Sequence, residues 1–251
     1  MPDAPPSAPS SALSQPALEA AASAEARLRL YQLVSPALPV GAFSYSEGLE
    51  WLVQQGMLTD GAAVLAWLEA ECRAGALAIE AASLPGLMEK LRRATDHQSA
   101  TGRQAMADVL ERQGWLLAQR EAPELRAQQR QMGSSLCQLL TDLGWPLPEG
   151  LPPLAWPAAW AWAGVCLEIP AGDLVEAYLY AWTASQLSAA VRLVPLGPTE
   201  AQRLQLALAP ALVHRARELA DSDPQTLWNA GVGAGIAQLG HGELYSRLFR
   251  S

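Results

Sequence analysis

The sequence has very little positive charge. It contains a single lysine, Lys90, and its 25 acidic residues outnumber the 17 lysine and arginine residues, which gives a formal net charge of −8. A protein that binds nucleic acid needs a basic surface to neutralise the phosphates. The charge balance therefore argues against nucleic acid as a partner.

Cysteine is also scarce. Cys72, Cys137 and Cys166 lie far apart in the sequence and form no Cys-x-x-Cys pattern. Three such cysteines are typical of free, buried thiols in a reducing compartment and not of a disulfide framework.

Targeting and membrane-spanning segments are not evident either. Residues 1–24 are rich in Ala, Pro and Ser and lack the basic start and apolar block of a signal peptide, so we predict a disordered arm. The uncharged stretch 150–167 is interrupted by three prolines, and its unbroken part is too short to cross a bilayer. We therefore expect no membrane association.

The motifs of the common enzyme classes are missing. There is no phosphate-binding Gly-x-x-x-x-Gly-Lys and no Gly-x-Ser-x-Gly nucleophile elbow. The glycines of residues 231–235 only partly mimic a dinucleotide-binding loop and follow no predicted strand, so a flexible connector is expected there. The three histidines, His97, His214 and His241, have no pattern that indicates a catalytic triad. The sequence therefore contains none of these catalytic and cofactor-binding signatures.

Hydrophobic residues make up half of the chain, and Ala and Leu dominate. This composition favours helices, and no alternating β pattern is present. We predict an all-α fold of about eight to eleven helices in one bundle-like domain, residues 25–240. The clearest helical segments are about 103–120, 123–143, 170–194 and 199–220. Gly75 and Pro85 are expected to divide the chain into short helices, and Pro210 to kink or split the last segment.

The stretch Leu30–Trp51 is the most distinctive part of the sequence. An apolar helical end runs into Pro36 and Pro39, which push the preceding residues into extended conformations. Ser44 and Glu47 have the spacing of a capping box, so we expect them to begin the next helix. The apolar corner between the two helices must be covered by the core or by a partner.

Several polar residues have two interpretations. His241 and Glu243 form at most a weak candidate metal site, of a kind that could take nickel, on a short tail. Arg126 and Arg130, spaced i, i+4, are either a solvated helix face or a cationic patch for an acidic partner. The tail, residues 241–251, carries apolar and basic side chains that either pack on the domain or become ordered when a partner binds: Tyr245, Arg247, Leu248, Phe249 and Arg250.

The corner motif Ser-Pro-Ala-Leu-Pro-Val-Gly-Ala-Phe-Ser-Tyr-Ser, residues 35–46, closely resembles the signature of the UreF family of urease accessory proteins. The resemblance runs from about Leu28 to the last residue. Four blocks carry it: Leu33–Trp51; Glu124–Arg126 with Arg130–Gly133; Ala177–Gln186 with Ala189–Gly197; and Tyr245–Ser251. The chain departs from the family at Arg192, where a lysine is usual, at Pro198, and around Gly240.

The resemblance implies a cytoplasmic, all-helical assembly factor that forms a homodimer. It also implies that the chain is not an enzyme and binds no cofactor itself, which agrees with the missing catalytic motifs. The chain would join UreD (also called UreH) and the GTPase UreG and help to insert nickel into apo-urease, while UreG binds and hydrolyses GTP. We expect these residues to contact partners: Glu47, Arg126, Arg130, Gln186, Arg192, Tyr245, Arg247, Leu248, Phe249 and Arg250. Two alternatives stay open: a regulator of UreG that supplies Arg126, Arg130 or Arg192 as an arginine finger, or a nickel carrier that uses His241.

Overall fold

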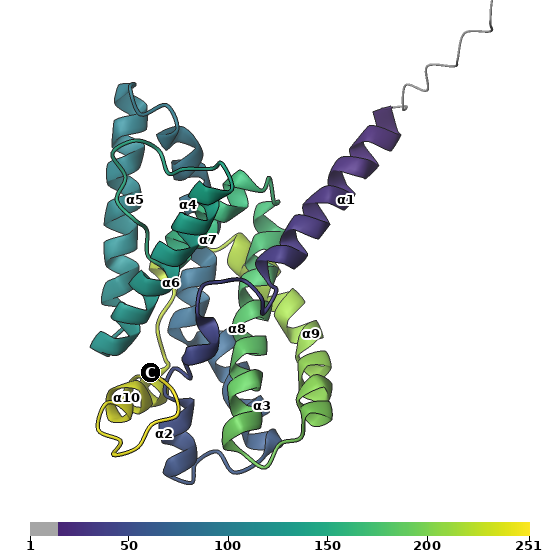
Figure 1. The fold of residues 1–251 in the computed structure, drawn as a ribbon, viewed down its shortest axis with the longest axis vertical. Helices are drawn as coiled ribbons and strands as arrows, with labels where there is room; N and C mark the ends of the chain where they lie inside the picture. The colour runs from purple at the N-terminus through teal and green to yellow at the C-terminus, as the bar shows by residue number, and fades with distance from the viewer. Residues whose placement is uncertain (1–14) are drawn as a thin grey trace, which may run out of the picture.

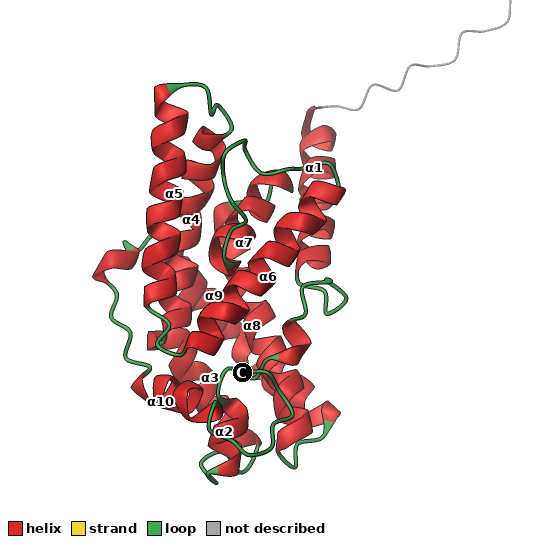
Figure 2. Cartoon of the chain, turned by 60° about the vertical axis from the view of Figure 1, so that its left-hand side comes forward, coloured by secondary structure: helices red, strands yellow, loops and turns green. Residues whose placement is uncertain are grey.

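The computed structural model describes residues 15–251, with side chains from Ala24 on. In this part of the chain it contains ten α-helices, two short 3₁₀ helices and no strand, which confirms the predicted all-α fold (Figures 1 and 2). The α-helices are α1 (Gln15–Leu33), α2 (Leu49–Gln54), α3 (Gly61–Ala74), α4 (Ala76–Ala94), α5 (Ala100–Ala118), α6 (Pro123–Asp142), α7 (Trp156–Cys166), α8 (Ala171–Leu193), α9 (Pro198–Ala220) and α10 (Val232–His241). The 3₁₀ helices are η1 (Ala42–Ser44) and η2 (Pro224–Thr226).

Helices α4 and α8 form the centre of the bundle. α4 packs against α3, α5, α7, α8 and α9, and α8 packs most extensively against α9. The first half of α4 is buried all round because it is mostly apolar, whereas its second half buries one face and exposes charged residues. The predicted central position of the helix ending near Val194 is confirmed by α8.

Several local predictions are confirmed at the helix ends. Asp60 caps α3, because its side chain accepts a hydrogen bond of 2.9 Å from the main-chain N–H of Ala63. Pro123 is the first residue of α6, where its missing N–H costs nothing. The three cysteines are free thiols in the structure, and Cys72 lies in the core as predicted.

Gly75 separates α3 from α4 as predicted, but the prediction that Pro85 would divide the chain was wrong, and Pro210 does not split its helix. Pro85 lies inside α4 and Pro210 lies inside α9, and both helices continue past them. An internal proline costs roughly 3 kcal/mol. Burial of one whole face of each helix against its neighbours outweighs that cost.

The predicted N-terminal arm is only partly described. Residues 1–14 lie outside the described residues. Residues 15–24, also assigned to the arm, instead form the first part of α1, which projects from the body of the molecule (Figure 1).

The capping box predicted for Ser44 and Glu47 was wrong. Ser44 belongs to η1, and α2 begins only at Leu49, after Gly48. Glu47 has a φ of 51°, an uncommon left-handed conformation for a side chain other than glycine, and its carboxylate points inward and is buried. The corner therefore directs this carboxylate into the core instead of using it to begin a helix.

The glycine-rich stretch 231–235 was predicted to be a flexible connector. It is instead the start of α10, whose buried side packs against α2. Gly48 and Gly240 allow the close approach, since a Cβ atom at Gly48 would meet the main-chain nitrogen of Gln238 at 2.9 Å. Among the described residues, none of the helices is both long and apolar enough to cross a bilayer.

Candidate functional site

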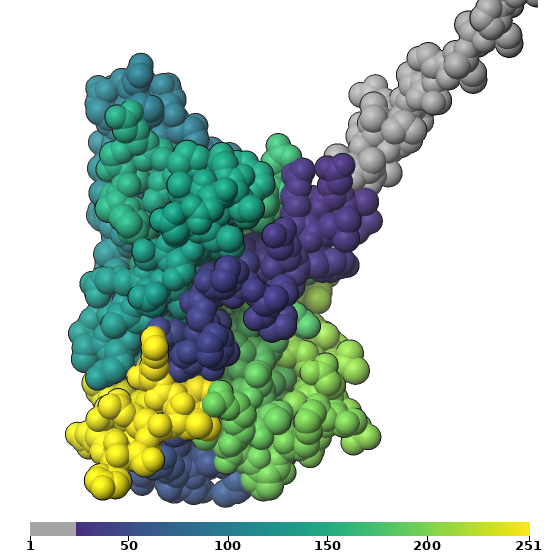
Figure 3. Space-filling view, viewed as in Figure 1, coloured from purple at the N-terminus to yellow at the C-terminus, as the bar shows by residue number. Residues whose placement is uncertain are grey.

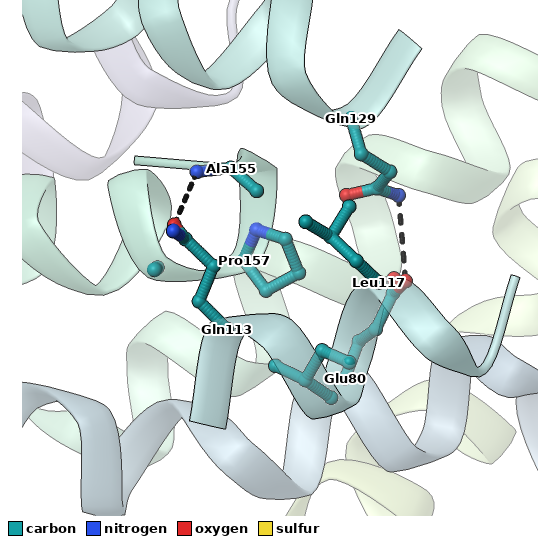
Figure 4. A pocket seen from close by; sticks show the side chains of 8 residues that line it. Glu80, Gln113, Leu117, Gln129, Ala155 and Pro157 are labelled. Atoms are coloured by element: carbon teal, nitrogen blue, oxygen red, sulfur yellow. Dashed lines mark hydrogen bonds between the residues drawn. The ribbon is translucent and has the colours of Figure 1, made fainter. Parts of the chain in front are cut away.

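A buried cluster of charged and polar side chains lies beneath the corner. Arg120, in the connection between α5 and α6, is almost fully buried and donates from Nε to Oε1 of Glu80 on α4 at 2.7 Å. The hydroxyl of Tyr178 on α8 donates to the other oxygen of Glu80 at 2.8 Å. Gln129 on α6 also donates to Glu80, and Figure 4 shows its amide nitrogen turned towards that carboxylate. Three helices and a loop therefore meet at one carboxylate.

Glu47 joins this cluster from the corner. Its Oε1 accepts a hydrogen bond of 2.8 Å from Gln128 on α6, and its Oε2 accepts one of 3.1 Å from the indole of Trp182 on α8. Arg120 also approaches Glu47, with 3.7 Å between Nη1 and Oε2. Burial alone would lower the pKa of Arg120, but Glu80 and Glu47 raise it above its usual value, so this residue stays charged.

The C-terminal tail, residues 242–251, is fastened to the corner at its end. The main-chain oxygen of Ser251 accepts hydrogen bonds from the main-chain N–H groups of Ser46 (2.6 Å) and Glu47 (3.0 Å) and from the Ser46 hydroxyl (2.7 Å). The hydroxyl of Ser251 donates to Gln128 at 2.6 Å. Because Gln128 also binds Glu47, the tail and the buried cluster share one hydrogen-bond network.

Glu50 on α2 holds the middle of the tail. Its two oxygens accept hydrogen bonds from the main-chain N–H groups of Leu248 (2.6 Å) and Phe249 (3.0 Å). Its Oε2 also lies 3.0 Å from Nε2 of His241. Since an ionised carboxylate can only accept hydrogen bonds, the contact with His241 requires a proton on Nε2.

His241 is therefore a structural residue of the interior in this structure. Its ring is 1 % exposed and lies under the tail at the end of α10, whereas the sequence placed it on a mobile segment. Among the described residues, no group of three or more His, Cys, Asp or Glu side chains could hold a metal ion. The geometry gives no support to His241 as a nickel ligand.

The predicted partner residues of the tail fall into two groups. Phe249 is buried and stacks under the guanidinium of Arg192 on α8, 4.6 Å from the ring centre. The other group faces outward and consists of Tyr245, Arg247, Leu248 and Arg250. Tyr245 is fully exposed. Figure 3 shows this tail as a continuous part of one face of the molecule. One side of the tail anchors it and the other is presented to solvent.

Helix α10 extends this outward face. Ala234, Ala237 and Gln238 are buried against the body, whereas Val232, Ile236 and Leu239 are exposed with a helical spacing. Together with Tyr245 and Leu248 they form what we call the tail face: Val232, Ile236, Leu239, Tyr245 and Leu248. An exposed apolar surface of this kind is typical of a protein-interaction site.

The two arginines predicted on α6 have different surroundings. Arg126 is partly buried, and its Nη1 donates to the main-chain oxygens of Arg120 (2.6 Å) and Glu121 (2.8 Å), so it holds the loop that carries Arg120. Arg130 is exposed. Gln186, predicted from the same resemblance, is buried on α8. The structure thus brings Glu47, Arg192 and the tail together around the corner, while Arg130 lies apart on the surface of α6.

Sequence reasoning missed Arg120, Glu80, Glu50 and Tyr178. Glu80 lies 40 residues from Arg120 and 98 residues from Tyr178, so no local spacing relates them. The one available signal was a set of acidic residues within otherwise apolar helical stretches, since such residues are rarely buried without a partner.

A further buried carboxyl, Glu71 on α3, has an unusual protonation. Burial raises its pKa to about 7, Arg120 opposes this, and Glu47 adds to it. Glu71 lines a small cavity of about 30 Å³ with Arg120 and Gln238. It is the acid in this region whose charge changes near neutral pH.

We expect the free energy of unfolding to fall by about 2 kcal/mol between pH 5 and pH 8 through Glu71 alone. The unfolded chain releases this proton near the usual glutamate pKa of 4.5, whereas the folded protein keeps it to about pH 7. The contribution is therefore complete below pH 4.5 and is lost as the pH rises to about 7. Urea unfolding of Glu71→Gln should lack this slope, and Glu69→Gln, an exposed change on the same helix, should keep it. Equal slopes in the wild type and Glu71→Gln would contradict the assignment.

Comparison with known proteins identifies the family of this chain. A model of the UreF family matches residues 58–209. The urease accessory protein UreF of Alkalilimnicola ehrlichii is 39 % identical over 231 residues, which cover 90 % of this chain and 96 % of that protein. The proteins of the same name from Synechocystis sp. (35 % over 245 residues, 91 % and 99 %) and from Prochlorococcus marinus strain MIT 9301 (35 % over 228 residues, 90 % and 99 %) are similarly related. The chain therefore belongs to the UreF family: it is an accessory protein of urease maturation and not an enzyme.

Proposed function

We propose that this chain is the scaffold subunit of a urease-activating complex in the cytoplasm. In this complex it holds UreD (UreH) and the GTPase UreG against apo-urease and so promotes GTP-dependent insertion of nickel. It acts as a homodimer and contributes shape and contacts, whereas GTP binds to UreG and nickel is handled by the assembly.

The observation that carries this proposal is the construction of the tail face. The tail is fixed from below by Glu50, Phe249 and Ser251, yet it presents Tyr245 and Leu248 outward. A surface whose backbone is already ordered loses less entropy on binding than a disordered tail would. Large exposed apolar and aromatic side chains on such a surface are the residue types that anchor protein interfaces.

We assign the tail face to UreD. The sequence left open whether the tail packs on its own domain or becomes ordered when a partner binds. In this proposal the tail is already packed on the domain when UreD binds it. Arg247 and Arg250, both exposed, would add charge complementarity at the rim of the interface.

Tyr245→Ala should weaken binding to UreD by about tenfold, because an exposed aromatic anchor typically contributes one to several kcal/mol. Binding can be measured by biolayer interferometry with purified UreD. The matched control is Tyr31→Ala, which removes another exposed tyrosine from α1. Unchanged affinity for Tyr245→Ala, or an equal loss for Tyr31→Ala, would remove the tail face from the UreD interface.

A regulator of UreG is the second candidate, and one observation favours it: Arg130 is exposed on α6 and free to approach a partner. Arg126 is committed to its own loop and Arg192 to Phe249. Measuring GTP hydrolysis by UreG with the wild-type chain and with Arg130→Ala separates the two functions. An arginine finger requires a large acceleration that Arg130→Ala abolishes, whereas a scaffold does not.

A further inference from the structure

A cavity of about 400 Å³ lies between the corner and helices α6, α7 and α8, and none of the contacts described above fills it. Its outer end is bordered by Phe43 and Tyr180, both exposed, and its inner end reaches the buried cluster at Glu47 and Arg120. This volume is in the range of sites that bind small molecules or single inserted side chains.

Aromatic rings form a substantial part of the lining of the cavity. Trp156 and Trp160 come from α7, Tyr178 and Trp182 from α8, and Tyr45 from the corner. Part of the wall on α8 is formed by small residues, which leave the space open. Aromatic faces attract cations as well as apolar groups, so this lining suits a ligand with both.

Two buried amide oxygens in the lining have no hydrogen-bond partner. Gln186 is 1 % exposed and its Oε1 is unpaired. Gln129 is also buried; its Nε2 donates to Glu80, which fixes the orientation of the amide, and its Oε1 is left without a donor. A buried polar atom without a partner costs about 1–3 kcal/mol. A ligand that donates hydrogen bonds would recover this cost.

The charge at the inner end of the cavity is negative. Glu47 and Glu80 line it, and Arg120 is the one cation among the residues that do so. A donor that carries a positive charge therefore suits this end better than a neutral donor.

We propose that this cavity is a binding site for a guanidinium, amidinium or primary ammonium group attached to an apolar body. The charged group donates to Gln186 at the inner part of the site, and the apolar body lies against the tryptophans. A free organic cation and the arginine side chain of another protein share this chemistry. The site does not depend on the tail face, so it stands whether or not UreD binds there.

The test uses the full-length chain with benzamidine as the probe and benzamide, its uncharged counterpart of nearly the same shape, as the control ligand. The indole N–H signals of Trp156, Trp160 and Trp182 report binding by NMR. Benzamidine should shift these signals and bind at least about fivefold more tightly than benzamide, which corresponds to about one net hydrogen bond.

Gln186→Leu is the matching variant. It replaces an amide whose oxygen is unpaired by an apolar group of similar size, so the protein should fold at least as stably as the wild type. It should weaken benzamidine binding at least about fivefold and leave benzamide unaffected. Gln205→Leu is the control, because Gln205 is also a buried glutamine with an unpaired Oε1 but lies on α9 and does not line the cavity.

A second arm distinguishes the sources of the ligand. The tripeptide acetyl-Leu-Arg-Leu-amide, compared with its citrulline analogue, represents a protein side chain. If the arginine peptide binds at the tryptophans more tightly than the citrulline peptide, a protein partner supplies the group. If benzamidine binds there and the arginine peptide shows no such preference, the ligand is a free organic cation. Binding of neither, or binding that Gln186→Leu does not weaken, overturns the proposal.

Discussion

Replacing Arg120 by methionine should lower the free energy of unfolding by about 3–5 kcal/mol, as is typical when one partner of a buried ion pair is removed. The change leaves Glu80, with Glu47 close by, as carboxylates in the interior without their cation. It also removes the hydrogen bond that links the loop between α5 and α6 to Glu80 on α4. Urea unfolding of the purified chain measures the effect through the shift in midpoint.

Arg130→Met is the matched control, because Arg130 is exposed on α6 and its replacement should change the free energy of unfolding by no more than about 0.5 kcal/mol. The double variant Arg120→Met/Glu80→Gln adds a sharper comparison. Removing the buried charge that Arg120 leaves behind should recover part of the loss, since the two side chains are in direct contact. A loss below about 1 kcal/mol for Arg120→Met would show that the cluster does not hold the fold together.

Replacing Glu50 by glutamine should release the tail. The carboxylate accepts hydrogen bonds from Leu248 N–H and Phe249 N–H and faces Nε2 of His241, and an amide presents an N–H₂ group to at least one of these donors. Hydrogen bonds to a charged group contribute about 1.5–3 kcal/mol each, so local opening of the tail should become about 100-fold more favourable.

Limited trypsin digestion measures this opening, because Arg247 and Arg250 lie within the tail and cleavage there proceeds through the open form. Glu50→Gln should be cut about 100-fold faster at these positions and should bind UreD more weakly. Glu243→Gln, which changes an exposed carboxylate at the start of the tail, should behave like the wild type. Cleavage of Glu50→Gln at the wild-type rate would mean that the tail is held by other contacts.

The helices could largely be predicted from the sequence because their signals are local. Asp60 and Pro123 mark helix starts through the chemistry of their own turns, and the burial of Leu136 and Leu140 follows from helical periodicity. Such features depend on residues three or four positions apart. The all-helical fold and the number of helices follow from them.

The site could not be predicted in the same way because its contacts are distant in sequence. Glu47 has the spacing of a capping residue, but its bonds to Gln128 and Trp182 depend on how α6 and α8 pack. The glycines of residues 231–235 indicate flexibility locally, yet they lie at the start of α10, a helix whose close packing against α2 depends on Gly48 and Gly240. Tertiary packing overrode the local signal in both cases.

The hydrogen bonds between Ser46 and Ser251 join residues 205 positions apart. During synthesis of the chain, the corner therefore lacks these hydrogen bonds until the ribosome has added the 205 residues that follow Ser46. Contacts of such sequence separation form late, because the intervening polypeptide must first be organised. A copy truncated before Ser251 would consequently leave the main-chain N–H groups of Ser46 and Glu47 at the corner without these hydrogen bonds.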